Sequence, residues 1–292
     1  MTNPTAFFVQ FPHPGGEHRP AVDEMGWNAG KHRRKFLRAP GRYQDGDGHV
    51  REGSLAFWGE WEPPSRIERR WPAAGRLPRA LHIPHWSPLP VDSFRQNTDP
   101  WVWGERMLYS NCKQTTGPDR RATSMQGLNP GSVICFGSTI DSEFCVDTIF
   151  VVASAEPWVP ADHDRLQVDD AFKICTGQAL TSATRDAQMR LTLYRAATLE
   201  DPVEGMFSFV PARLADRDPR FARPNVHLPG LINPASRQST WGSRRSLRVA
   251  TVRDIWASIR DQVLAQGLLL AVGLRTPPRD DEYSSQETSQ RD

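Results

Sequence analysis

The chain has 292 residues, with 36 basic and 34 acidic side chains and a net charge of +2. This near balance excludes a protein that coats nucleic acid without sequence preference, because such binding depends on a marked excess of basic charge. With 38% hydrophobic and 24% charged residues, the composition is that of a globular protein and not of a disordered one.

The N-terminal residues MTNPTAFFVQ lack the basic start and the long apolar core of a signal peptide. No apolar run approaches the roughly 18 residues that a membrane span requires. The four cysteines include no CxxC pair, so a structural zinc site is not expected. We therefore expect a cytoplasmic protein with free thiols and no membrane partner.

In chain order, the first expected elements are short and separated by turns. An apolar run at 7–11 predicts a strand, and the polar, glycine-rich segment 42–50 predicts a turn or an exposed hairpin. Partial alternation predicts a strand over 54–62. The repeated prolines of 63–90 predict mostly irregular structure.

The clearest β signal lies in the middle of the chain. Residues 131–138 form a short apolar run between glycines, and 144–152 form a longer run rich in β-branched residues. The connection at 139–143 has the length of a turn, so we expect a β-hairpin in the core. Asp147 interrupts the second strand, and a buried carboxylate either pairs with an arginine or is functional.

The C-terminal half has fewer signals. Residues 188–197 fit a strand or a helix, and 206–211 fit a strand. Apolar residues at three- and four-residue spacing predict a helix over 252–270, and the polar tail 279–292 is expected to be disordered. We predict one β-rich α+β domain over residues 1–278, with an antiparallel sheet or a small barrel and a C-terminal helix.

Several common catalytic motifs do not occur in this chain. It has no P-loop, no GxGxxG motif after a strand, no HExxH motif and no GxSxG motif. This removes the commonest nucleotide hydrolases, dehydrogenases, zinc proteases and α/β-hydrolases from consideration.

Histidines occur in two short polar segments. His13, Glu17 and His18 lie on a glycine-bearing loop, where they would line a site, bind a metal or be solvated. His82 and His85 lie on a segment broken by proline, so their spacing does not place them on a common face. We assign no metal ligand from these patterns.

Acidic and aromatic residues alternate in the strand expected at 54–62. Trp58, Glu60 and Glu62 would share one face of this strand, and Trp61 would lie on the other. Glutamates beside a tryptophan suit the recognition of a base edge, because a carboxylate accepts from exocyclic N–H groups. The alternative is a solvated acidic face with one buried tryptophan.

The segment 96–114 is the most polar and aromatic stretch of the chain. Gln96, Asn97 and Asp99 supply amide and carboxylate groups, and Trp101 and Trp103 supply stacking surfaces or core packing. The pattern therefore predicts one wall of a binding pocket.

Cys112 lies in the same segment, among polar residues and next to Lys113. A thiol in such surroundings is the best candidate for a reactive one, although a buried and satisfied thiol is the alternative. Cys135 and Cys145 lie in apolar strands and are expected to be inert core residues.

Most of the basic side chains are arginines, which suit bidentate contacts with phosphate. Arg33, Arg34 and Arg70 are candidates for phosphate binding. The alternative is that each belongs to a solvated face of the protein.

A family resemblance is carried by residues 128–136, LNPGSVICF, followed by the strand that ends in Phe150, Val151 and Val152. This stretch resembles the small β-barrel domains of the PUA-like group, of the ASCH and EVE types, although Ser132 stands where those domains carry an aspartate. The resemblance implies a barrel that binds nucleic acid or a modified base. The whole chain is also similar, without a diagnostic motif, to proteins of bacterial DNA-modification and defence islands.

Together these patterns favour an enzyme that acts on a nucleobase, free or within nucleic acid. Cys112, Asp99 and Glu60 would be catalytic, with the thiol attacking an electrophilic carbon such as a nitrile in a hydrolase or hydratase reaction. The alternatives are a non-catalytic reader of modified nucleic acid and a small-molecule enzyme of secondary metabolism. The sequence identifies no cofactor and no oligomeric state.

Overall fold

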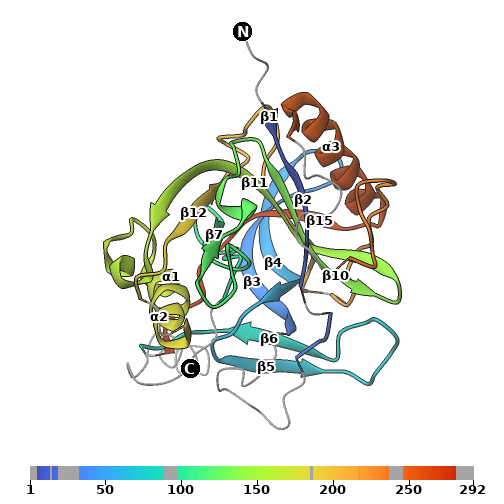
Figure 1. The fold of residues 1–292 in the computed structure, drawn as a ribbon. Coiled ribbons are helices and arrows are strands. Elements are labelled where there is room, and N and C mark those ends of the chain that lie inside the picture. The colour runs from blue at the N-terminus through green and yellow to red at the C-terminus, as the bar shows by residue number, and fades with distance from the viewer. Residues whose placement is uncertain are drawn as a thin grey trace.

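The computed structural model describes residues 5–13, 15–18, 33–88, 98–184, 187–216, 218–236 and 246–280 (Figure 1). Strands account for 41% and helices for 16% of the structure. The expectation of a β-rich protein with a C-terminal helix is therefore confirmed. Within the described ranges, no helix has both the length and the apolar character that crossing a bilayer requires.

One sheet has five strands in the order β2-β10-β11-β12-β7. Its strands are β2 (Phe8–Pro12), β7 (Leu108–Tyr109), β10 (Val133–Ile140), β11 (Glu143–Trp158) and β12 (Leu191–Ala196). β2 runs parallel to β10, and the other pairs are antiparallel. The predicted core hairpin is β10–β11, and its turn residues Asp141 and Ser142 have φ values of 48° and 65°. Positive φ at both positions matches the right-handed twist of the strands that the turn connects.

The second sheet has six strands in the order β15-β13-β4-β3-β6-β5. Its strands are β3 (Arg34–Gln44), β4 (Val50–Glu60), β5 (Ser65–Arg70), β6 (Ala80–Pro84), β13 (Val210–Leu214) and β15 (Leu269–Leu274). β15 pairs with β3 as well as with β13, so β3, β4, β13 and β15 close into a ring. The hairpin predicted at 42–50 is the β3–β4 connection.

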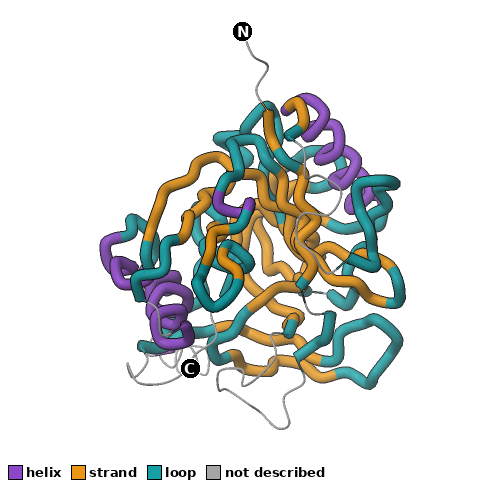
Figure 2. The backbone as a smooth tube through the Cα atoms, in the orientation of Figure 1, coloured by secondary structure: helices purple, strands orange, loops and turns teal. Residues whose placement is uncertain are grey.

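The remaining elements are small and lie around the two sheets (Figure 2). Two short ladders pair β1 (Thr5–Ala6) with β14 (Leu247–Arg248) and β8 (Thr115–Thr116) with β9 (Arg121–Ala122). The helical segments are η1 (Ser124–Gln126), η2 (Pro160–Arg165), α1 (Asp170–Phe172), η3 (Lys173–Gln178), α2 (Ala179–Thr184) and α3 (Val249–Ala265). α3 lies beside β1, whereas α1 and α2 lie on another side of the molecule (Figure 1).

Both faces of β4 are buried from Leu55 to Glu60, which explains the weak polar alternation of this half of the strand. Leu55 and Phe57 pack into one hydrophobic cluster, whereas Ala56 and Trp58 pack into a second. Since successive strand residues point to opposite faces, β4 separates the two clusters. The strand therefore carries Glu60 into the interior at its C-terminal end.

The segment 63–90, expected to be mostly irregular, contains the two strands β5 and β6, with Pro84 at the end of β6, where a missing N–H breaks no central ladder. One expectation from the sequence is wrong. The helix expected to reach residue 270 ends at Ala265, because Gly267 has a φ of 70° and turns the chain into β15. The apolar residues that follow thus belong to a strand.

Three further segments are placed by the structure. Residues 188–197, ambiguous in sequence, contain the strand β12, and the strand expected at 206–211 starts only at Val210. Most of the tail predicted to be disordered lies outside the described residues. Its described part, Arg279 and Asp280, packs against Trp86 and His85.

Candidate functional site

A buried ion-pair network joins the two sheets. Arg34, at the start of β3, donates from Nη1 to Glu60 Oε2 at 2.6 Å and from Nε to Asp147 Oδ2 at 2.6 Å. All three side chains are at most 2% exposed. Arg34 and Glu60 are cross-strand partners, and Asp147 comes from β11. The buried carboxylate of Asp147 therefore pairs with an arginine, which was one of its two expected roles.

His13 extends this network from the end of β2. Its Nδ1 lies 2.9 Å from Glu60 Oε2, the same oxygen that accepts from Arg34. Burial, and then the charge of Arg34, lower the pKa of His13 below its usual value. A neutral imidazole that donates from Nδ1 to Glu60 fits these surroundings.

A second buried arginine offsets the remaining negative charge. Arg223 lies close enough to Asp147 for the carboxylate to raise its pKa, although burial dominates and lowers that pKa to about 10. Its guanidinium donates to Ser138 Oγ and to the carbonyl oxygen of Gly15, and it lies 5.0 Å from the centre of the Trp58 ring. Arg34 and Arg223 thus balance Glu60 and Asp147, as buried charges require.

Backbone N–H groups of one loop bind the carboxylate of Asp99. Oδ1 accepts from the Ser110 amide at 2.8 Å, and Oδ2 accepts from the amides of Asn111 and Cys112 at 3.1 and 2.7 Å. These bonds favour the carboxylate, but complete burial outweighs them and raises the pKa of Asp99 to about 6. The charge of Glu60 adds to this rise. Asp99 is therefore mostly ionised at pH 7 and titrates in a range useful for proton transfer.

Cys112 lies against Asp99 and is partly buried. Burial raises the pKa of its thiol well above 9, and the charges of Asp99 and Glu60 and a hydrogen bond to Asp99 raise it further. Asp99 Oδ2 thus contacts the Cys112 amide, and Glu60 lies close enough for its charge to raise the pKa of both groups. The three residues predicted to be catalytic come from positions 60, 99 and 112 in the chain. The sequence, however, indicates a reactive thiol, whereas these surroundings keep it protonated.

Lys113 is the cation next to this thiol. Its Nζ donates to the carbonyl oxygen of Pro12 at 2.5 Å and lies 4.7 Å from the centre of the Phe11 ring. The side chain as a whole is exposed, but the loss of solvent around its ammonium lowers the pKa of Lys113 to about 8. Its charge opposes the rise in the thiol pKa of Cys112.

The tryptophans predicted to stack on a ligand are core residues instead. Trp101 and Trp103 pack edge-on or tilted against Trp61, with ring centres 5.8 and 5.4 Å away. Trp58 lies in the second cluster, 5.2 Å from Phe36, and donates from Nε1 to the Phe221 carbonyl. All three side chains are buried, as is usual for large aromatic residues that contribute to a core.

The other predicted ligand contacts are placed as follows. Glu62 is fully buried beyond the end of β4, and its amide donates to Thr98 Oγ1 at 3.1 Å. Gln96 and Asn97 lie outside the described residues. Arg33 and Arg70 are exposed, whereas Arg34 is buried with two carboxylates. Phosphate binding by Arg34 stays a prediction, and two of its nitrogen atoms already bind Glu60 and Asp147.

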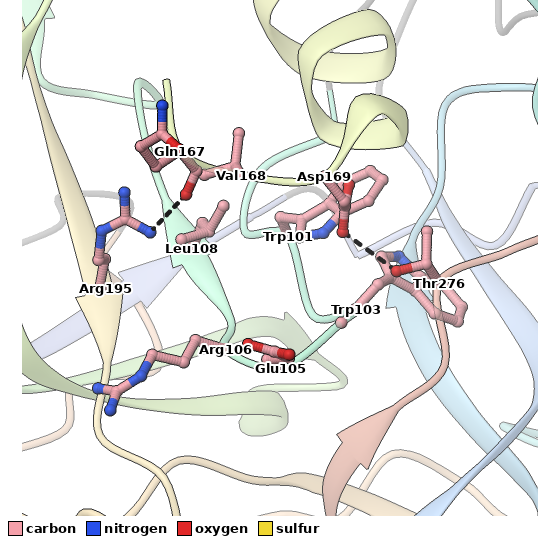
Figure 3. Close-up of a pocket in the computed structure, with 11 residues that line it drawn as sticks. Trp101, Trp103, Glu105, Arg106, Leu108, Gln167, Val168, Asp169, Arg195 and Thr276 are labelled. Carbon is pink, nitrogen blue, oxygen red and sulfur yellow. Dashed lines mark hydrogen bonds between the residues drawn. The ribbon is translucent and has the colours of Figure 1, made fainter. Parts of the chain in front are cut away.

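A polar pocket of about 590 Å³ opens beside Trp101 and Trp103 (Figure 3). Arg106 and Arg195 lie on one side of it, and Asp169 accepts from Thr276 Oγ1 at 3.1 Å on the other. The lining includes neither Cys112 nor any member of the Arg34 network. This hollow is therefore distinct from the cluster of perturbed titratable groups, and the latter is the stronger candidate for chemistry.

Asp45, Asp47 and His49 are the described residues that best fit a metal ion, since one ligand atom from each lies within 4.8 Å of the others. They occupy the exposed β3–β4 loop, where Asp45 accepts from the amides of Asp47 and His49. This is ordinary turn chemistry, so the loop needs no metal to explain it.

Two residues of the Arg34 network, Arg223 and His13, are not among the site residues predicted from the sequence. Arg223 lies in a proline-punctuated loop without a local signal, and only the tertiary structure brings it to Asp147. Comparison with known proteins adds no assignment, because no family model, no curated protein and no solved structure matches this chain.

Proposed function

We propose that this protein is an enzyme that acts on a nucleobase, free or within nucleic acid, with Cys112 as its nucleophile. The observation that carries the proposal is the contact between Cys112 and Asp99, both with displaced pKa values, within reach of the charge of Glu60. Such clusters concentrate at catalytic sites, because chemistry at neutral pH needs acids and bases that titrate there.

The pKa values constrain how the thiol would react. The pKa of the thiol is raised well above its usual value and the pKa of Asp99 is about 6, so complete proton transfer from the thiol to Asp99 is unfavourable. Attack must therefore be coupled to proton transfer, with the substrate carbon taking the sulfur electrons as Asp99 takes the proton. Asp99 then returns this proton to the substrate.

For a nitrile, the product of this step is a thioimidate. The Sγ–C bond forms, one C–N π bond breaks, and the nitrogen receives the proton through Asp99. Water then adds to the thioimidate carbon, and departure of the thiol leaves an amide, so the net reaction is the addition of one water. Glu60, held by His13 and Arg34, keeps a negative charge beside Asp99 and preserves its basicity.

A donor in the network supports recognition of a polar, planar ligand. Among the residues that the structure describes, Arg34 Nη2 is buried and has no hydrogen-bond partner. A carbonyl oxygen or ring nitrogen at a base edge would accept from it. Phe11 lies 4.8 Å from the His13 ring and the Tyr109 hydroxyl donates to the carbonyl oxygen of Cys112, so these two rings replace the tryptophans as candidates for contact with the base.

The resemblance of residues 128–136 to PUA-like domains belongs to this proposal. That segment leads into β10, which pairs with the strand β11 that carries Asp147. A PUA-like origin would give the site a nucleic-acid or modified-base ligand, in line with the proposed substrate class.

The test is a mass measurement on nucleosides and short DNA that carry a nitrile on the base. Wild-type protein is expected to convert the nitrile to the amide with the gain of one water, and a Cys112→Ala variant is expected to do so no faster than buffer. Asp99→Asn should retain binding and lose most of the turnover, whereas a matched change of the exposed Asp170 to asparagine should have no effect.

Two outcomes would count against the proposal. Normal turnover by Cys112→Ala would remove Cys112 as the nucleophile. Saturable binding of the base by wild-type protein, without conversion, would favour the non-catalytic reader instead.

A further inference from the structure

A basic cluster lies where β3, β5 and β6 meet, outside the residues used above. Lys35 on β3 and His82 on β6 are each about 1% exposed. The two strands are parallel neighbours, paired at Leu37 and His82. His18 joins them from the segment that bonds to Arg34, and its ring centre lies 6.0 Å from that of His82.

His82 has one satisfied and one unsatisfied ring nitrogen. Its Nδ1 lies 3.1 Å from Ser65 Oγ. When the Ser65 hydroxyl donates to Nδ1, the ring proton is on Nε2 and points away from Ser65. Within the described part of the chain, this buried Nε2 has no hydrogen-bond partner. A buried donor of this kind calls for an acceptor.

The charges around both histidines have one sign. Lys35 and Arg70, together with His18, act on His82, and Lys35 and Arg33 act on His18. No carboxylate among the described residues is a source of the shift at either ring. Glu17, next to His18, accepts from the backbone amide of Arg79 instead. Burial and these cations lower the pKa of His82 to about 3 and that of His18 to about 4.

We infer that His18, Lys35 and His82, with Arg33 and Arg70 near them, bind a phosphate group. Phosphate supplies acceptor oxygens in several directions, which suits donors that arrive from three strands and a loop. Its double negative charge also attracts the cations that act on both rings, although Lys35 Nζ also donates to the carbonyl oxygen of Pro63 at 3.1 Å. The inference goes beyond the proposed function, since it needs no chemistry at Cys112, and it gives phosphate a place other than Arg34.

The test is a titration of histidine-labelled protein with inorganic phosphate, followed by NMR of the ring signals at constant ionic strength. We expect saturable shifts of the His18 and His82 signals and a rise in both pKa values, because a bound anion favours the protonated rings. The exposed His49 and His227 serve as internal controls and should not respond.

Variants distinguish a site from a general salt effect. His82→Gln should weaken phosphate binding by about tenfold or more, as expected for loss of a charge-assisted contact. His18→Gln, at a half-buried position, gives the same test if the buried variant does not fold. Unchanged affinity in the folded variants, or shifts of equal size at His49 and His227, would overturn the assignment.

A second arm identifies the source of the phosphate. Tighter binding of a deoxynucleoside 5′-monophosphate than of inorganic phosphate would assign the site to a nucleotide, and equal affinity would assign it to free phosphate. A nucleoside without phosphate that produces the same shifts would contradict the inference. Because the readout is binding, its failure is distinct from a failure of Cys112 chemistry.

Discussion

Removal of Arg34 should expose the energetic cost of the charges buried between the sheets. Arg34→Met keeps a long apolar stem but leaves Glu60 and Asp147 without the cation that both contact at 2.6 Å. At an effective dielectric constant of about 20, charges roughly 4 Å apart attract by about 4 kcal/mol. The variant no longer carries the desolvation cost of burying Arg34, but its two buried carboxylates have lost the cation between them. We therefore expect a net loss of about 3–5 kcal/mol in unfolding free energy.

Charge-matched variants separate this effect from lost packing. Asp147→Asn leaves the Arg34–Glu60 pair intact and should cost about 1–3 kcal/mol. The double variant Arg34→Met, Asp147→Asn removes one charge of each sign. It should therefore be more stable than the sum of the single changes predicts, by about 1–3 kcal/mol.

Urea unfolding followed by tryptophan fluorescence gives these free energies. A loss below about 1 kcal/mol at pH 7, or additive single changes, would refute the network as described.

Three further predictions concern separate parts of the molecule. Asp99→Asn removes a charge that raises the pKa of Cys112, so the pH midpoint for alkylation of this thiol, measured by peptide mass analysis, should move down. Gly137→Ala places a Cβ 2.2 Å from a backbone carbonyl oxygen, so it should lower the unfolding free energy, measured by thermal unfolding, by about 2 kcal/mol or more. The control Gly46→Ala, whose Cβ has nothing within 4 Å, should leave the stability nearly unchanged. The pKa of His82 is lowered in the fold to about 3. The contribution of its neutral ring to folding stability is therefore fully present above pH 6.5 and is lost as the pH falls. From pH 7 to pH 5, wild type should lose about 2 kcal/mol more than His82→Gln, and equal losses would show that the ring is not buried.

The sequence was informative where local rules apply. The β10–β11 hairpin followed from two apolar runs with a short polar connection, and the pairing of Asp147 followed from the cost of a lone buried charge. By contrast, β5 and β6 were hidden by prolines that lie at strand ends. Local composition does not reveal which strands are central, so it cannot tell a tolerated proline from a disruptive one.

The predicted site illustrates the same limit. Glu60, Asp99 and Cys112 were chosen for their chemical type, and the fold brings them together, but their protonation depends on burial that no sequence pattern reports. The tryptophans were assigned to ligand stacking because they lie among polar residues. In the structure Trp101 and Trp103 pack against Trp61, and Asp99 beside them accepts from the backbone of the adjacent loop.

The opposite behaviour of Asp99 and Cys112 determines how the site would operate. Both groups are buried, and burial raises the pKa of each, but three backbone donors keep the pKa of Asp99 within reach of neutral pH. Among the described residues, only the charge of Lys113 favours the thiolate of Cys112. The resting state at pH 7 is therefore a carboxylate beside a thiol, with Lys113 as the cation able to favour charge separation. A ligand that excludes more water would raise the pKa of Cys112 further and make a free thiolate still less accessible. Catalysis through Cys112 thus requires an electrophile placed against the sulfur before the proton moves, and the same arrangement protects the thiol from general alkylating agents in the absence of substrate.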